Sequence, residues 1–188
     1  MADKCGFEPD EERHDLPEPE KIMIRELLPE ERDLLKDFLY EAIFIPEGVQ
    51  PPPKEIIEQP ELRIYYEDFG SHPADHCLAA EADGRVVGAV WSRIMHDYGH
   101  VDDQTPSLAI SLIREYRGKG IGTRLMVEIL SVLKDCGYRQ VSLAVQKANY
   151  AVRMYENVGF TTVNENEEEY IMVCDLRESS GRKKGRRS

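Results

Sequence analysis

Metal-binding and redox motifs are absent from this sequence of 188 residues, which has few cysteines and histidines. The four cysteines lie far apart, without a CxxC pair, and the five histidines form no HExxH pattern. Structural and catalytic metal sites need spacings of that kind. We therefore expect no metal site, and free thiols in a reducing cytoplasm. The cysteines are Cys5, Cys77, Cys136 and Cys174.

Long apolar runs and positive charge are also scarce. Without a run of about 20 apolar residues, we expect neither a membrane span nor a secretory signal peptide. Lys and Arg number 24 against 36 Asp and Glu, which gives a net charge of −12. Such a chain is a poor ligand for nucleic acid and attracts cationic ligands, although an acidic surface often serves only solubility.

The composition divides the chain into one domain and two tails. Residues 1–20 carry eight acids and two bases, and residues 181–188 carry five bases and no acid. Both ends have few apolar residues, which is typical of disorder. Hydrophobic residues make up 41% of the chain, enough for one core of ordinary size. We expect an acidic tail at 1–20, one domain at 21–178 and a basic tail at 179–188.

Hydrophobic periodicity predicts a mixed α/β sheet of about seven strands. The Asp83-Gly84 pair between two strand-like runs is typical of a type I′ hairpin turn. Later, a strand, a helix and another strand follow in order, and such a crossover implies parallel pairing. The expected strands are 22–27, the two arms of a hairpin within 77–95, 107–113, 140–145 and a last hairpin within 160–176. The expected helices begin at 29, near 55, at 120 and at 150.

The segment "REYRGKGIGTRL" (114–125) lies between an expected strand and the start of an expected helix. The first amides of a helix lack intrahelical partners, and the helix dipole adds positive potential there. Glycines allow close backbone approach, and Arg117 and Lys119 add charge. We therefore expect a phosphate or pyrophosphate site, the alternative being a plain glycine-rich turn. The spacing fits neither a Walker loop nor G-x-G-x-x-G but R-x-x-G-x-G, at Arg117, Gly120 and Gly122.

That signature resembles the acetyl-CoA pyrophosphate loop of the GNAT superfamily of N-acetyltransferases. The resemblance extends from about residue 22 to residue 176 and includes the order of elements. The stretch "QKANYAVRMYENVGF" resembles the family's N-x-A-x-x-x-Y-x-x-x-G-F pattern, with matches at Asn149, Ala151, Tyr155, Gly159 and Phe160. It implies a mostly antiparallel seven-stranded sheet flanked by about four helices, with a bulged fourth strand that splays from a parallel fifth strand.

The resemblance also implies a donor site. Pantetheine would lie along the fourth strand like an extra strand, and a backbone N–H near Leu112 would polarise the thioester carbonyl. Asn149 would contact the cofactor, or serve as an N-cap of the following helix, or both. The expected acetyl-CoA-binding residues are Ile110, Ser111, Leu112, Arg117, Gly118, Lys119, Gly120, Ile121, Gly122, Thr123 and Asn149.

Acetyl transfer to an amine needs a base for the amine, a polarised carbonyl and an acid for the leaving thiolate. Tyr155 matches the family's general-acid position, and a phenol of pKa about 10 stays protonated at neutral pH. Its alternative role is that of a packing aromatic. The base is missing from one position that some members use, which here is Ala144. Glu41, Glu81, His100, Asp102, Asp103 or a chain of water molecules to solvent remain open.

The sequence therefore predicts an enzyme that transfers acetyl from acetyl-CoA to a primary amine of a small molecule, peptide or protein by direct attack through a tetrahedral intermediate. Two alternatives stay open: a CoA-binding module without robust catalysis, and transfer of another short acyl group. Aromatic and acidic residues in the first helical region fit an ammonium, but core packing explains several of them. The resemblance allows a monomer or a homodimer.

Overall fold

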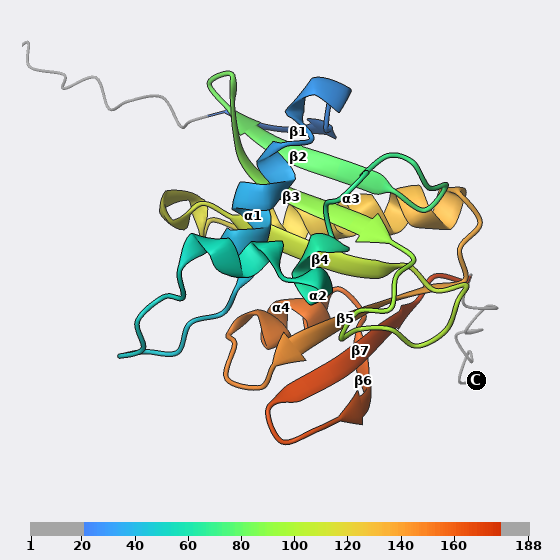
Figure 1. Cartoon of the computed structure of the whole chain (residues 1–188). Helices are drawn as coiled ribbons and strands as arrows, with labels where there is room; N and C mark the ends of the chain where they lie inside the picture. Colours follow the sequence, from blue (N-terminus) through green and yellow to red (C-terminus); the bar gives the residue numbers. More distant parts are fainter. Residues whose placement is uncertain (1–20, 178–188) are drawn as a thin grey trace, which may run out of the picture.

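A seven-stranded mixed sheet forms the centre of the molecule, with helices on both faces (Figure 1). The computed structural model describes residues 21–177, so the predicted tails at 1–20 and 179–188 lie outside the described residues. The strand order is β1-β2-β3-β4-β5-β7-β6, and only β4 and β5 are parallel. The predicted mostly antiparallel sheet with a parallel fourth and fifth strand is confirmed. The strands are β1 (Ile22–Glu26), β2 (His76–Ala82), β3 (Arg85–Arg93), β4 (Ser107–Leu112), β5 (Gln140–Gln146), β6 (Thr161–Glu165) and β7 (Glu169–Asp175).

Four α-helices lie against the two faces, and the two longest, α1 and α3, each present an apolar stripe to the sheet. On one face α1 and the segment around α2 form a cluster with β3 that is centred on Trp91. On the other face α3 and α4 form the larger cluster. The helices are α1 (Leu34–Ala42), α2 (Pro60–Arg63), α3 (Ile121–Asp135) and α4 (Ala151–Asn157), with 3-10 turns at Pro29–Glu31, Lys54–Glu58 and Arg114–Tyr116. None of the helices among residues 21–177 is long and apolar enough to cross a bilayer.

The hairpin of β2 and β3 has the predicted turn. Asp83 and Gly84 both have positive φ, 48° and 77°, as a type I′ turn requires. The predicted bulge in the fourth strand is wrong. β4 pairs with β3 without a shift from Leu112–Gly88 to Ser107–Arg93. Register shifts lie instead between β2 and β3, where Val87 is the extra residue, and between β6 and β7, where it is Val163.

Candidate active site

The parallel strands β4 and β5 meet at one end and then separate. Their pairing among the described residues joins Ser107 to Ser142, where the Ser142 amide donates to the Pro106 carbonyl at 2.9 Å. Beyond that point β4 stays in register with β3, and β5 with β7. Each strand is thus held by its other neighbour, and the sheet opens toward the carboxyl ends of β4 and β5.

Alternate backbone amides of β4 bond to β3, and the amides between them point into this opening. The Ile113 amide donates to the Val87 carbonyl at 3.0 Å, which makes that pair a hydrogen-bonded one. Because such pairs alternate along an antiparallel ladder, residues 107, 109 and 111 bond to β3. The amides of Ile110 and Leu112 therefore point away from β3, toward the gap.

Ser111 differs from its two predicted companions on β4. Its main chain faces β3, and its buried hydroxyl donates to the Phe38 carbonyl at 2.7 Å. Ser111 thus fastens α1 to β4 and does not face the opening. Leu112 packs closely from the other side, since a Cβ at Gly88 would lie 2.2 Å from a Leu112 methyl carbon. These contacts fix the strand whose backbone forms the edge.

The glycine-rich loop follows β4 and ends in the first turn of α3. Gly118 and Gly120 have φ of 74° and 77°, a conformation that other residues rarely adopt. No heavy atom of the described chain lies within 4 Å of a Cβ built on either, so their need for glycine is conformational. Gly122 has a packing role, because its Cβ would lie 3.3 Å from the Met154 sulfur of α4. Ile121 is buried, whereas Thr123 is exposed beside the loop.

The two loop cations have different environments. The Arg117 guanidinium donates through Nε to the Leu112 carbonyl at 2.8 Å and through Nη2 to the Glu41 carboxylate at 2.7 Å. It thereby ties the loop to β4 and to α1. Lys119 is exposed, with its ammonium 4.9 Å from the centre of the Tyr116 ring.

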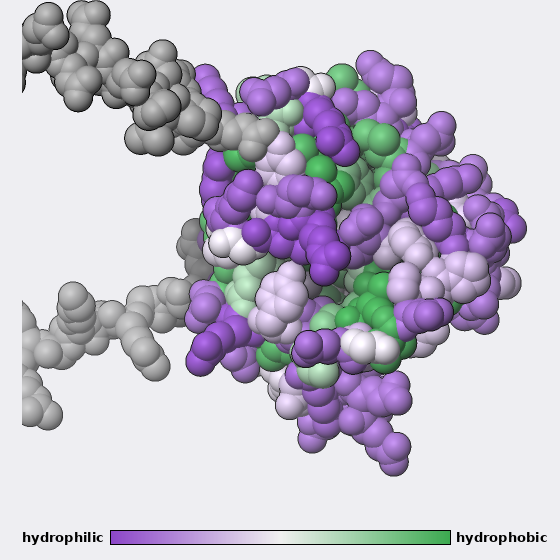
Figure 2. Space-filling view, turned by 90° about the vertical axis from the view of Figure 1, so that its left-hand side faces the viewer, coloured by the Kyte–Doolittle hydropathy of each residue, from purple (hydrophilic) through white to green (hydrophobic). Residues whose placement is uncertain are grey.

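Figure 2 shows the left-hand side of Figure 1, where the glycine-rich loop and α4 lie. Polar residues dominate this face, and hydrophobic residues show between them near its centre. Two hollows of about 330 and 530 Å³ are lined by residues from the α1 side of the sheet. Neither is lined by Ile110 or Leu112, so they do not mark the opening.

Tyr155 lies on α4 in the same hydrophobic cluster as Leu112 and Ile121. Its side chain is buried, with its ring 5.9 Å from that of Phe160. Burial, with a smaller contribution from nearby Tyr150, raises the pKa of Tyr155 above its usual range. The phenol is therefore protonated at neutral pH. The N-cap of α4 is Tyr150 rather than the predicted Asn149, but the Asn149 side chain accepts a hydrogen bond from the Ala151 amide at 2.9 Å and so satisfies the first amide of the helix.

One carboxylate was missed by the sequence reasoning. Asp97, in the loop between β3 and β4, accepts hydrogen bonds at Oδ2 from the Tyr65 hydroxyl at 2.8 Å and the Ser107 hydroxyl at 2.6 Å. Its Oδ1 is buried and has no hydrogen-bond partner among the described residues. Burial and then the Asp97 charge raise the pKa of Tyr65, which stays a donor. The sequence gives no sign of this site, because the partner Tyr65 lies 32 residues before Asp97 and the two form no known motif.

The carboxylates considered from the sequence have other partners. Glu81 pairs with Arg25 at 2.6 Å, and Glu41 with Arg117. Asp102 accepts from the Gln104 amide and the Thr105 hydroxyl, which hold its own turn together. These interactions lower the pKa of Asp102, the Thr105 bond most strongly.

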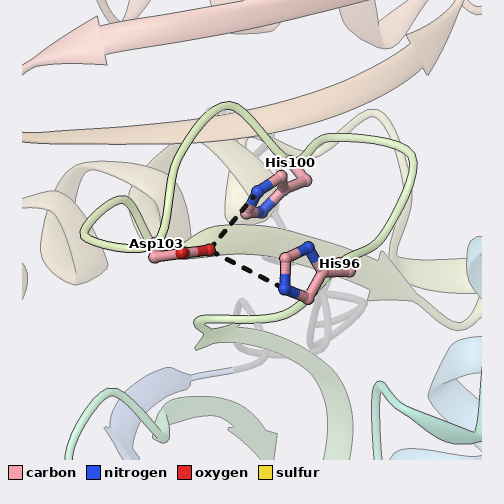
Figure 3. A group of neighbouring side chains, drawn as sticks. All are labelled: His96, His100 and Asp103. Carbon is pink, nitrogen blue, oxygen red and sulfur yellow. Dashed lines mark ion pairs between the residues drawn. The ribbon is translucent and has the colours of Figure 1, made fainter.

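Asp103 and His100 belong to a surface cluster with His96 (Figure 3). One Asp103 oxygen lies 3.7 Å from His96 Nε2 and 3.6 Å from His100 Nε2. Each of the three side chains has one potential metal-ligand atom, and these atoms lie within 4.8 Å of one another. His96 and Asp103 are 82% and 81% exposed, however, so the cluster is a solvated surface and we assign it no ion.

A sheet that opens between two parallel strands beside a glycine-rich helix start defines the class of acyl-group transferases that take their donor from coenzyme A. The sequence model of the Acetyltransferase (GNAT) family matches residues 39–160, more than half of the chain. The chain therefore belongs to the GNAT acetyltransferase family.

Curated relatives are enzymes named for acetyl transfer. An N-alpha-acetyltransferase of Saccharolobus solfataricus is 32% identical over 62% of this chain and 80% of its own length. A mycothiol acetyltransferase of Pseudarthrobacter chlorophenolicus is 27% identical over 78% of this chain, which spans only 46% of that protein.

Solved structures share the fold. A PaiA N-acetyltransferase from Thermoplasma acidophilum in complex with coenzyme A superposes with a TM-score of 0.61 at 22% identity, over 82% of this chain and 99% of its own. An N-acetyltransferase from Staphylococcus aureus gives a TM-score of 0.62 at 19% identity, over 84% and 99%. At such identities the likeness concerns the fold alone.

Proposed function

We propose that the protein transfers an acetyl group from acetyl-CoA to a primary amine, by direct attack of the amine on the thioester. The observation that carries the proposal is the β4 edge. The amides of Ile110 and Leu112 face a gap in the sheet, and this edge leads to the glycine-rich start of α3. An extended amide chain with a thioester at one end and a pyrophosphate at the other fits such an edge.

In the donor complex, the loop from Gly118 to Thr123 and the first turn of α3 bind the pyrophosphate with backbone amides. Lys119 adds a mobile positive charge, and Asn149 contacts the cofactor from the start of α4. We propose that Arg117 acts chiefly by holding the loop, because its guanidinium already bonds to Leu112 and Glu41.

In the chemical step, the amine nitrogen forms a bond to the thioester carbon while an amide of the β4 edge bonds to the developing oxyanion. The tetrahedral intermediate then breaks its carbon–sulfur bond. Tyr155, buried and protonated, donates its proton to the leaving thiolate. Acceptor and donor thereby leave as an amide and a free thiol.

The acceptor is either a small-molecule amine or an amine of a peptide or protein. Similarity to an N-alpha-acetyltransferase over 80% of that protein's length makes a peptide α-amine the first acceptor to test. A cytoplasmic location and a monomeric or homodimeric state stay predictions from the sequence.

The test is coenzyme A release, followed with a thiol reagent, over a panel of peptide α-amines and small alkyl amines. We expect turnover with at least one acceptor, and we expect mass spectrometry to detect the acetylated peptide or amine. Tight coenzyme A binding, measured by calorimetry, without turnover of any amine would instead favour the binding-module alternative. Turnover that rises with propionyl- or butyryl-CoA would favour a longer acyl group.

A further inference from the structure

We propose that Asp97 is the general base that receives the proton of the acceptor amine through bridging water molecules. This inference rests on the proposed N-acetyltransferase function. It supplies the base for which sequence reasoning found no carboxylate at Ala144 on β5.

The carboxylate of Asp97 is bonded at one oxygen and unpartnered at the other. Both the Tyr65 and the Ser107 hydroxyls donate to Oδ2, which fixes the side chain from two elements. Oδ1 is left buried without a partner among residues 21–177. A buried acceptor is costly to leave unpaired, so this oxygen requires a donor, which a bound water at the start of a proton relay supplies.

Asp97 lies at the closed end of the opening between β4 and β5. Ser107, which donates to it, is the β4 residue paired with Ser142 of β5. Gly99, two residues after Asp97, packs so tightly there that its Cβ would lie 2.7 Å from the Ser107 hydroxyl and 2.9 Å from the Ala144 amide. The loop of Asp97 thus runs against β5 beside Ala144, the position where the sequence lacks a carboxylate.

The reach to the reacting carbon is short. A strand rises about 3.3 Å per residue, so Ser107 and Ile110 lie about 10 Å apart. Because the Asp97 carboxylate already lies beside Ser107, a chain of about three water molecules, at about 2.8 Å per hydrogen bond, covers that span. Ser142 also has a buried hydroxyl without a partner in the described range, and its register places it beside Ser107 on the same face of the sheet. It is a second polar group for such a water.

The surroundings of Asp97 suit a cation. Arg93 is the β3 residue paired with Ser107, and its charge is already matched by Asp75 at 2.8 Å. The Asp97 carboxylate beside Ser107 has no such cation bonded to it, because its partners are the Tyr65 and Ser107 hydroxyls. An acceptor ammonium can therefore supply the matching charge.

The proton balance closes with Asp97 and Tyr155 together. An ammonium has three protons on nitrogen and the product amide has one. Asp97 receives the first and releases it to solvent, then receives the second as the carbon–nitrogen bond forms. Tyr155 gives its proton to the thiolate and is reprotonated from solvent or Asp97. The net result is amide, free coenzyme A and one released proton.

The experiment compares acceptors of different basicity in the full-length chain. Asp97→Asn keeps the size of the side chain and removes the base. For an alkyl amine of pKa about 10.4, which is protonated at pH 7, we expect kcat/KM to fall about 100-fold or more. For a weakly basic acceptor that is already neutral at pH 7, such as a hydrazide, we expect a fall of less than about tenfold. Acetyl-CoA affinity should stay within about twofold.

Asp103→Asn is the matched control, because that carboxylate lies on the same loop and is 81% exposed. It should leave both rates unchanged. Asp97→Glu, which restores a carboxylate, should recover part of the alkyl-amine rate and also serves if the amide variant misfolds. Equal losses of Asp97→Asn on both acceptors, or no loss, would overturn the inference. A wild-type protein that acetylates no amine would instead overturn the proposed function and the inference with it.

Discussion

At the scale of single residues, the local contacts determine which of the predicted side chains are free to act on a substrate and which already have structural bonds. Tyr155 is buried in an apolar cluster, which keeps its proton in place. The Ser111 hydroxyl already bonds to a carbonyl of α1, and the Arg117 guanidinium already bonds to Leu112 and Glu41. We therefore propose that main-chain amides of β4 form the donor edge and that the Tyr155 phenol is the acid.

Replacing Tyr155 by Phe tests the acid directly. The ring keeps its packing against Phe160, and only the proton donor is lost. We expect kcat to fall about 100-fold with KM for acetyl-CoA changed by less than about twofold. Tyr150→Phe is the control, because that tyrosine lies on the same segment but is 73% exposed. A wild-type kcat in Tyr155→Phe would remove this residue from the mechanism.

The motif residues were predictable from the sequence because their spacing is local. Arg117, Gly120 and Gly122 fall within six positions, and Asn149 and Tyr155 within seven. Asp97 was not, since its partner Tyr65 comes from the region of α2. No local pattern distinguishes it from Asp102 or Asp103, and only tertiary contacts do so.

At the scale of elements, the helices and strands follow the hydrophobic pattern, and the errors concern boundaries and register. The helix predicted from residue 29 is a 3-10 turn at Pro29–Glu31 followed by α1 from Leu34, and the helix predicted from Gly120 begins at Ile121 after a left-handed Gly120. The bulge expected in β4 lies at Val87, one strand away. Both β3 and β4 are largely buried without a clear alternation, so the sequence pattern does not indicate which strand takes the extra residue.

The glycine-rich loop as an element permits a test of its two cations. Arg117→Ala removes the tie to β4 and α1, so we expect coenzyme A affinity to fall about tenfold with little change in its salt dependence. Lys119→Ala removes an exposed charge, so a loss of about threefold should shrink as ionic strength rises. Calorimetry between 50 and 500 mM salt, a range over which the Debye length falls about threefold, measures both. Unchanged affinity in the double variant would contradict the pyrophosphate assignment.

At the scale of the whole molecule, a buried ion pair joins β3 to the segments that cover it. Arg93 at the end of β3 is almost completely buried, with 6% of its side chain exposed, and Asp75 is 0% exposed. Arg93 donates to both Asp75 oxygens at 2.8 Å and to the carbonyls of Ile64 and Glu67. One ion pair thus joins β3, the segment after α2 and the entry to β2, the framework on which the loop of Asp97 rests.

The stability of this framework should depend on pH through Asp75. Burial alone would raise the pKa of Asp75, but bonds from Arg93 and from the Gly70 and His72 amides outweigh it and lower the pKa below its usual 3.8. A carboxylate with a lowered pKa in the folded state stabilises the fold above its unfolded pKa and loses that contribution as pH falls through the folded value. The contribution is therefore complete at pH 7 and declines below about pH 4.

Asp75→Asn should lower the free energy of unfolding at pH 7 by about 3 kcal/mol, because it leaves the buried Arg93 without its counter-charge. The difference between wild type and variant should shrink as the pH falls below about 4, where wild-type Asp75 becomes neutral as well. Urea denaturation of both proteins from pH 7 to pH 3 measures it. Glu67→Gln, which breaks an exposed ion pair with Arg63, should cost less than about 0.5 kcal/mol throughout. A difference between wild type and Asp75→Asn that stays constant over this range would show that the Asp75 charge does not stabilise the fold.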